Sequence, residues 1–192
     1  MPVLLRILAL SFLINSAPLH AVEDGAAQFG AQATVPAVCN FSSQPRVVAA
    51  QNMTLSSGGD ATRVNVSSMF DEATATLKPG SITLAVLAIC NLPHQVGLST
   101  AAGVMRPLNP QEARAPFIGE VRYRAIARWG SQNLMLIADG SGPKSVNVET
   151  AHAAVGEFHV EIKVDGTDND LTIPVVADTY SDIIVLHIAA RL

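Results

Sequence analysis

Alternation of apolar and polar residues recurs along this chain and constrains its fold more than any other feature. Between residues 158 and 164, the apolar positions are Phe158, Val160, Ile162 and Val164, and the polar positions are His159, Glu161 and Lys163. Successive side chains of a β-strand point to opposite faces of a sheet, so this period of two predicts a strand with one buried and one solvated face.

Other segments give the same indication. Short strands are predicted at 63–67, 95–100, 119–129, 145–148, 171–176 and 180–189. The most apolar run of the mature chain, residues 81–91, follows Pro79-Gly80 and predicts a central strand buried on both faces. Residues 101–117 hold three prolines and predict an irregular loop. Roughly eight to ten short strands separated by turns predict an all-β fold, built as an antiparallel sandwich.

Residues 1–21 have the pattern of a secretion signal. Arg6 precedes a short apolar run, and Leu19 and Ala21 occupy the −3 and −1 positions of a cleavage site. The run is too short to span a bilayer, and no later segment is long and apolar enough. We therefore expect an exported mature chain of one domain without a membrane span; an N-terminal anchor is the alternative.

Two cysteines, Cys39 and Cys90, follow that signal. A cysteine pair in an oxidising compartment is most simply one disulfide. A metal site or a reactive thiol is the alternative, although neither a Cys-x-x-Cys motif nor a nearby histidine pair supports it. The net charge of −4 comes without a basic cluster that could neutralise phosphates, and we expect no nucleic-acid partner.

The stretch directly before Cys39 alternates again. Its apolar parity holds Phe29, Ala31, Ala33 and Val35. Such a segment could be the first strand of the domain or a free arm that pairs elsewhere, and alternation alone leaves both open.

Residues 177–188 resemble the closing strand of the spore coat protein U domain, a family that includes subunits of archaic chaperone–usher pili. That family has a Gly-x-Tyr-x-Asp turn before an alternating apolar strand. Tyr180 and Asp182 occupy the motif positions, and Asp178 replaces the glycine. The apolar positions that follow are Ile184, Leu186 and Ile188.

Two further segments are similar to this family. Residues 82–90 followed by 96–99 resemble its second cysteine strand and the next strand. Val121-x-Tyr123 followed by Trp129-Gly130 is similar to a mid-domain Tyr and Trp-Gly pair, although Ala125 and Ile126 depart from the family's usual Leu and Tyr.

The resemblance implies an immunoglobulin-like antiparallel β-sandwich at 39–192 that lacks its last strand, with a donor-strand arm at 22–38. An open edge over an exposed core is unstable and prone to aggregate. In such pilins a periplasmic chaperone first supplies a strand, and the arm of a neighbouring subunit later replaces it, an instance of β-strand addition. The arm residues that would fill the groove are Phe29, Ala31, Ala33 and Val35. Because the two alanines are small, we expect a minor or adaptor subunit.

The sequence therefore predicts a structural subunit of a bacterial surface pilus, or fimbria, that supports adhesion or biofilm formation. Its expected partners are a periplasmic chaperone, an outer-membrane usher and neighbouring pilus subunits. It would pass through the periplasm and reside at the cell surface. A monomeric secreted coat protein or adhesin-type binding module with a complete sandwich is the alternative.

We expect no catalysis, no cofactor and no metal. The mature chain's histidines (His94, His152, His159 and His187) lie on separate segments, and no nucleophile-elbow, zinc or phosphate-loop motif is present. The acidic segment 165–170 does not fit the spacing of a calcium-binding EF-hand, so a solvated turn is predicted. Tyr123 and Trp129 could line a carbohydrate-binding surface, but a core or strand-pair role is expected.

Overall fold

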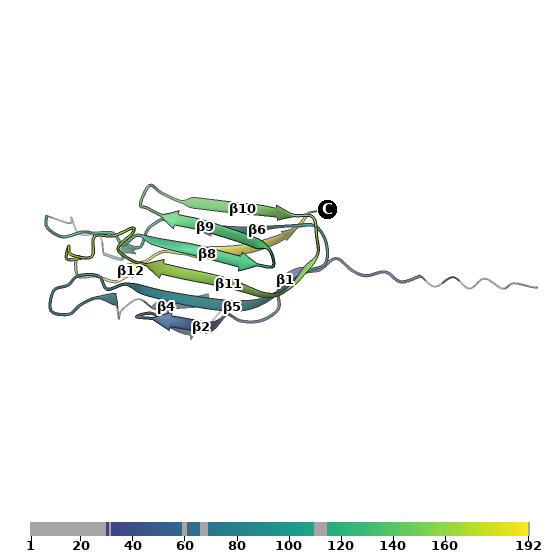
Figure 1. The fold of residues 1–192 in the computed structure, drawn as a ribbon, viewed down its shortest axis with the longest axis horizontal. Helices are drawn as coiled ribbons and strands as arrows, with labels where there is room; N and C mark the ends of the chain where they lie inside the picture. Colours follow the sequence, from purple (N-terminus) through teal and green to yellow (C-terminus); the bar gives the residue numbers. More distant parts are fainter. Residues whose placement is uncertain (1–29, 31, 59–60, 66–68, 110–114, 192) are drawn as a thin grey trace, which may run out of the picture. The chain divides into compact units, whose positions relative to one another are not determined.

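The computed structural model describes residue 30 and residues 32–58, 61–65, 69–109 and 115–191, and Figure 1 shows their arrangement. The chain divides into two units, residues 1–35 and 36–192. Within the first unit, the described residues 30 and 32–35 form no strand. The second unit contains all the strands of the described residues, which include no helix.

The second unit is built from thirteen short strands in its described part. They are β1 (Cys39–Phe41), β2 (Arg46–Gln51), β3 (Thr54–Gly58), β4 (Ala61–Asn65), β5 (Gly80–Cys90), β6 (His94–Thr100), β7 (Arg106–Pro107), β8 (Tyr123–Trp129), β9 (Gln132–Ala138), β10 (Lys144–Thr150), β11 (Ala154–Val164), β12 (Tyr180–Ser181) and β13 (Ile184–Ala190).

These strands form antiparallel sheets, which confirms the predicted all-β class. The largest sheet has the order β1-β5-β11-β8-β9, and β2 also pairs with β5. A three-stranded sheet has the order β10-β6-β13, and the pairs β12-β7 and β3-β4 stand apart from both. Every pairing between these strands is antiparallel.

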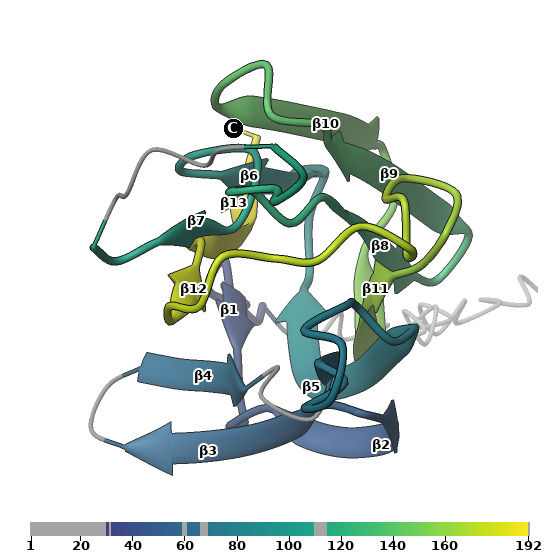
Figure 2. The ribbon, with the colours of Figure 1, turned by 90° about the vertical axis from the view of Figure 1, so that its left-hand side faces the viewer.

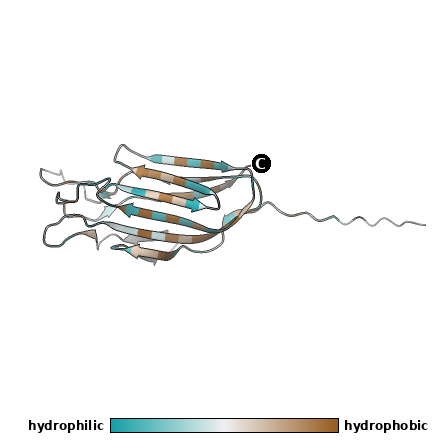
Figure 3. Ribbon diagram, viewed as in Figure 1, coloured by the Kyte–Doolittle hydropathy of each residue, from teal (hydrophilic) through white to brown (hydrophobic). Residues whose placement is uncertain are grey.

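One hydrophobic core joins the large sheet and the three-stranded sheet. Alternate residues of β8 and β11 are buried, and Figure 3 shows their alternation as bands of contrasting hydropathy. From the three-stranded sheet, Val96 and Leu98 of β6 are fully buried in the same cluster. Figure 2 shows β6 and β13 on one side of the molecule and β8 and β11 on the other. Tyr123 and Trp129 belong to this core, as predicted.

Two of the predicted strands need correction. Residues 171–176 form no strand and make only isolated bridges, Thr76 with Pro174 and Ile118 with Val175. Pro174 has no N–H to give to a ladder, which explains why pairing does not extend there. The strand predicted at 180–189 is divided into β12 and β13 at Asp182 and Ile183.

The central strand β5 is largely buried on one face and unevenly buried on the other, where Ala85 is 1% exposed. It lies between β1 and β2 on one edge and β11 on the other, as a central strand should. Its inner face is largely buried, but Leu87 on the outer face is 47% exposed. The prediction of burial on both faces holds for the inner face but fails at Leu87 on the outer face.

Strand β9 was not predicted at all. Leu134, Leu136 and Ala138 face the core, whereas Met135 and Ile137 between them are exposed. Because both faces carry apolar residues, the strand lacks the alternation by which the others were found.

Candidate functional site

Two of the C-terminal residues singled out in the sequence, Tyr180 and Asp182, lie just before β13. Tyr180 is buried, and its hydroxyl donates a hydrogen bond of 2.8 Å to the carbonyl of Val176, four residues earlier. Burial, followed by the nearby negative charge of Asp178, raises the pKa of Tyr180 above its ordinary value. The phenol is thus held neutral as a donor, and it fixes the turn that leads into β13.

The carboxylate of Asp182 connects three segments of the chain. Its Oδ1 accepts from the backbone N–H of Ala102 at 2.8 Å, and its Oδ2 accepts from the N–H of Val104 at 3.2 Å. The hydroxyl of Tyr123 on β8 donates to the same Oδ2 at 2.7 Å. Burial, together with this bond, raises the pKa of Tyr123. Asp182 therefore ties the start of β13 to the loop after β6 and to the opposite sheet.

Strand β13 lies at an edge of the three-stranded sheet. It pairs with β6 from Ile184 opposite Thr100 to Ala190 opposite His94. Among the described residues, no strand pairs with its other edge. Its inward-facing side chains, Ile184, Leu186 and Ile188, are only partly buried. The site is thus a free strand edge above an incompletely covered apolar row.

The opposing edge of the large sheet is also unpaired within the described part of the chain. Strands β1 and β2 both pair with β5 alone, and β2 is exposed along its whole length. Phe41 of β1 is partly buried against the core and lies edge-on to the ring of Phe158, with the ring centres 6.1 Å apart.

A small cavity lies where residues 70–75 meet residues 175–180. It has a volume of about 200 Å³ and apolar walls that include Phe70, Val175 and Tyr180. Asp71 and Asp178 also line it, but each has a partner of its own: Lys78 at 3.2 Å from Asp71, and the backbone N–H of Asn109 at 3.0 Å from Asp178. Tyr180 therefore belongs both to this cavity and to the turn before β13.

The predicted donor residues lie partly outside the described chain. Phe29 and Ala31 are not among the described residues. Ala33 is exposed, and Val35 is 77% exposed. Residues 36–38, which were assigned to the arm from the sequence, belong to the second unit.

The base of the arm is held by Asn91, a residue that sequence reasoning did not single out. Its Oδ1 accepts from the N–H of Val38, and its Nδ2 donates to the carbonyl of Pro36, both at 2.8 Å. The backbone N–H of Asn91 also donates to the carbonyl of Val38 at 3.0 Å. A single asparagine after a cysteine carries no sequence pattern that would have revealed this role.

Cys39 and Cys90 form the predicted disulfide. The two residues lie opposite each other in the pairing of β1 with β5. Disulfides persist mainly in oxidising compartments, so the bond favours a location outside the cytoplasm.

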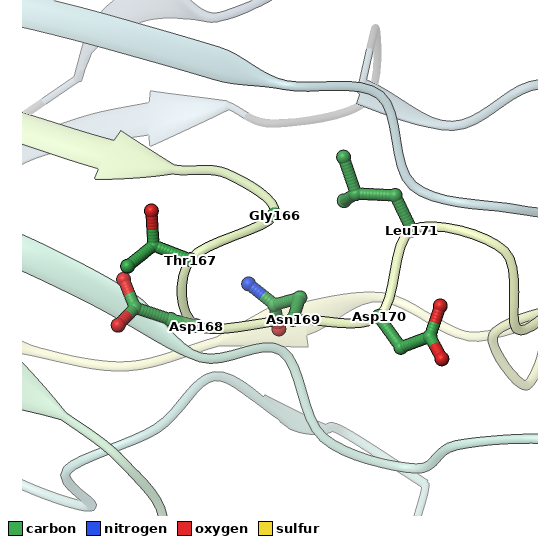
Figure 4. Close-up of a pocket in the computed structure, with 6 residues that line it drawn as sticks. All are labelled: Gly166, Thr167, Asp168, Asn169, Asp170 and Leu171. Atoms are coloured by element: carbon green, nitrogen blue, oxygen red, sulfur yellow. The ribbon is translucent and has the colours of Figure 1, made fainter.

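The acidic turn after β11 has partners within the protein. Asp165 accepts from Arg124 at 2.6 Å and lies 3.0 Å from Lys163, while Asp168 lies 2.8 Å from Arg124. Desolvation opposes ionisation of Asp165, but hydrogen bonds from Lys163, Thr167 and Arg124 outweigh it and hold its pKa well below the usual range. Figure 4 shows the carboxylates of Asp168 and Asp170 pointing apart, so they do not converge on a common point.

The histidines also stay apart. His94 is fully buried, with its Nδ1 2.9 Å from the carbonyl of Leu92 and its ring packed against Trp129. His159 is partly exposed, and His187 lies over Gly97 on the outer face of the three-stranded sheet. The described residues contain no group of three His, Cys, Asp or Glu side chains that could hold a metal ion.

Within the described chain, no helix has the length and apolar character needed to cross a membrane. Comparison with protein-family models and with curated proteins finds no match for this chain.

Proposed function

We propose that this chain is a secreted structural subunit of a bacterial surface pilus, assembled by β-strand addition between copies or related subunits. In this proposal the second unit is an immunoglobulin-like sandwich that lacks its last strand. The segment before Pro36 is the donor that completes a neighbour. The free edge of β13, with its partly buried apolar row, is the observation on which the proposal depends.

The order of the strands supports this assignment. A constant-type immunoglobulin domain has one sheet ordered A-B-E-D and a second sheet in which C, F and G are neighbours. The order β1-β5-β11-β8 corresponds to A-B-E-D, and β6 and β13 correspond to C and F. A seventh strand, G, would lie along the edge of β13 that is unpaired in the described residues.

The turn before β13 gives independent support. In immunoglobulin-like domains, a tyrosine near the start of strand F often hydrogen-bonds to the backbone a few residues earlier. The hydroxyl of Tyr180 makes such a bond to the carbonyl of Val176. The disulfide between β1 and β5 is consistent with passage through the periplasm, where a chaperone could occupy the free edge before an outer-membrane usher assembles the fibre.

The first test adds the donor strand as a separate peptide. The chain from residue 36 to 192 is refolded oxidatively with or without a synthetic peptide of residues 25–37, and its thermal unfolding is measured. We expect the peptide to raise the melting temperature, because it covers the apolar row and pairs with β13. A Phe29→Asp peptide is the matched control and should raise it much less. An equally stable monomer with and without the peptide would support the alternative, a monomeric coat or adhesin module with a complete sandwich.

The same idea can be tested in the chain from residue 22 onward. It should form SDS-resistant ladders before boiling, and removal of residues 22–35 should abolish them. Leu186→Asp, on the inner face of β13, should also abolish the ladders, whereas Val185→Asp, on its outer face, should leave them. The far-ultraviolet circular dichroism spectrum of each acceptor variant shows whether its fold was retained, and hence whether the groove alone was lost.

A further inference from the structure

We propose that Asn91 is a positioning residue that holds the base of the arm straight, so that the arm completes a second copy and not its own domain. This inference rests on the proposed function. It names the residue that determines which domain the arm completes. We call the contact between Asn91, Pro36 and Val38 the Asn91 clamp.

The clamp continues the pairing of β1 with β5 beyond the strands. Cys39 lies opposite Cys90, so Val38 and Asn91 are the next opposed pair. Their backbones share one bond, from the N–H of Asn91 to the carbonyl of Val38. The side chain of Asn91 then binds the N–H of Val38 and the carbonyl of Pro36. Three hydrogen bonds thus hold residues 36–38 as a continuation of β1.

At the end of this ladder, the side chain of Asn91 binds backbone groups on both sides of Ala37. Proline has no N–H, so an ordinary antiparallel ladder could not continue through it in full. The side-chain amide of Asn91 supplies a donor for the Pro36 carbonyl and an acceptor for the Val38 N–H. One short side chain therefore replaces a further strand residue at the end of the sheet.

The direction of residues 36–38 determines what the arm can reach. The C-terminal end of β13 lies close to the clamp, since Ala190 is opposite His94 and the N–H of Arg191 donates to the carbonyl of Pro93 at 2.8 Å. The edge of β13 runs from this point back along the sheet towards Ile184. To place Val35 and the residues before it along that edge in its own domain, the chain would have to reverse direction within residues 36–38.

Such a reversal is incompatible with the clamp. A tight turn takes about four residues, and its central residues leave the extended conformation. It would break the bonds to Asn91, because those bonds require residues 36–38 to lie alongside residue 91. While the clamp is closed, residues 36–38 cannot make this turn, and in our proposal the edge of β13 therefore stays open for another chain.

The test removes the side chain in the chain from residue 22 onward. We expect Asn91→Ala to speed amide hydrogen exchange at Val38 and to lower the yield of SDS-resistant ladders several-fold. Monomer should rise in proportion, and this monomer should no longer capture the synthetic peptide of residues 25–37, because its own arm occupies the edge. Asn91→Asp keeps the acceptor for Val38 but loses the donor to Pro36. Its ladder yield should lie between those of the wild type and Asn91→Ala. Asn133→Ala, at an exposed amide of β9, is the control and should behave as the wild type.

A purely structural role for Asn91 would give a different result. In a chain lacking residues 22–35, Asn91→Ala should still capture the peptide as the unsubstituted chain does, because no arm competes. Equal loss of capture with and without the arm would overturn the inference, and so would wild-type ladder yield from Asn91→Ala. If the wild type itself forms no ladders and captures no peptide, the proposed function fails, which is a separate outcome.

Discussion

At the scale of single residues, Asp182 and Tyr123 determine how β13 begins. They lie 59 positions apart, Tyr123 on β8 and Asp182 between β12 and β13, and a hydrogen bond of 2.7 Å joins them. The carboxylate also binds two backbone N–H groups of the loop after β6. The sequence pointed to each residue separately through the family resemblance, but nothing in a local pattern predicts that they meet.

We predict that Asp182→Asn destabilises the protein more than Tyr123→Phe. Asparagine keeps one acceptor oxygen and presents an NH₂ group to Tyr123 or Val104, so at least one donor in the interior loses its acceptor. Hydrogen bonds to charged groups contribute about 1.5–3 kcal/mol and neutral ones about 1 kcal/mol. Tyr123→Phe removes one hydrogen bond to this carboxylate, so we expect a loss of about 1.5 kcal/mol. Asp182→Asn weakens several such bonds at once, and we expect a loss of about 3 kcal/mol. Urea unfolding measures both, and a larger loss for Tyr123→Phe would contradict this account.

At the scale of elements, the three-stranded sheet depends on a glycine. Asn147 of β10, Gly97 of β6 and His187 of β13 lie in register across the sheet. A Cβ atom at Gly97 would lie 1.9 Å from Cε1 of His187 and 2.2 Å from Oδ1 of Asn147. The side chains from the two outer strands thus close over the middle strand, and only glycine leaves them room.

We predict that Gly97→Ala loosens the attachment of β13. The added methyl group must displace the ring of His187, and we expect a cost of about 1 kcal/mol. The double variant Gly97→Ala with His187→Ala should recover part of that loss, because the ring is then absent. Thermal unfolding of the four proteins in this cycle measures the coupling between the two residues. Strictly additive losses would show that the ring is not the obstacle.

Alternation of apolar and polar residues predicted some strands correctly and failed for others. Strands β8 and β11 were predicted because one face of each meets the core and the other does not. Strand β9 was missed because exposed Met135 and Ile137 make both its faces apolar. Residues 171–176 looked like a strand, but Pro174 and the turn at Asp170, which accepts hydrogen bonds from Thr172, prevent a continuous ladder.

At the scale of the whole molecule, the disulfide closes a long loop. Cys39 and Cys90 are 51 residues apart, and the chain-entropy model gives about 4 kcal/mol for a loop of this length. We predict that replacing both cysteines by serine lowers the free energy of unfolding by roughly that amount. Unfolding of the wild type in a reductant should give a similar loss, and an unchanged midpoint in both experiments would contradict the prediction.

The sequence by itself determined the all-β class, the antiparallel arrangement, the cysteine pair and most of the long strands. The strands follow from patterns within ten or so residues, because alternation reports which face of a strand is buried, and the disulfide follows from there being only two cysteines. Only the tertiary structure decided that the edge of β13 lies free among the described residues, that Asp182 meets Tyr123, and that Asn91 holds Pro36 and Val38. These hydrogen bonds join residues more than fifty positions apart. No local pattern specifies where the path of the chain brings such residues together.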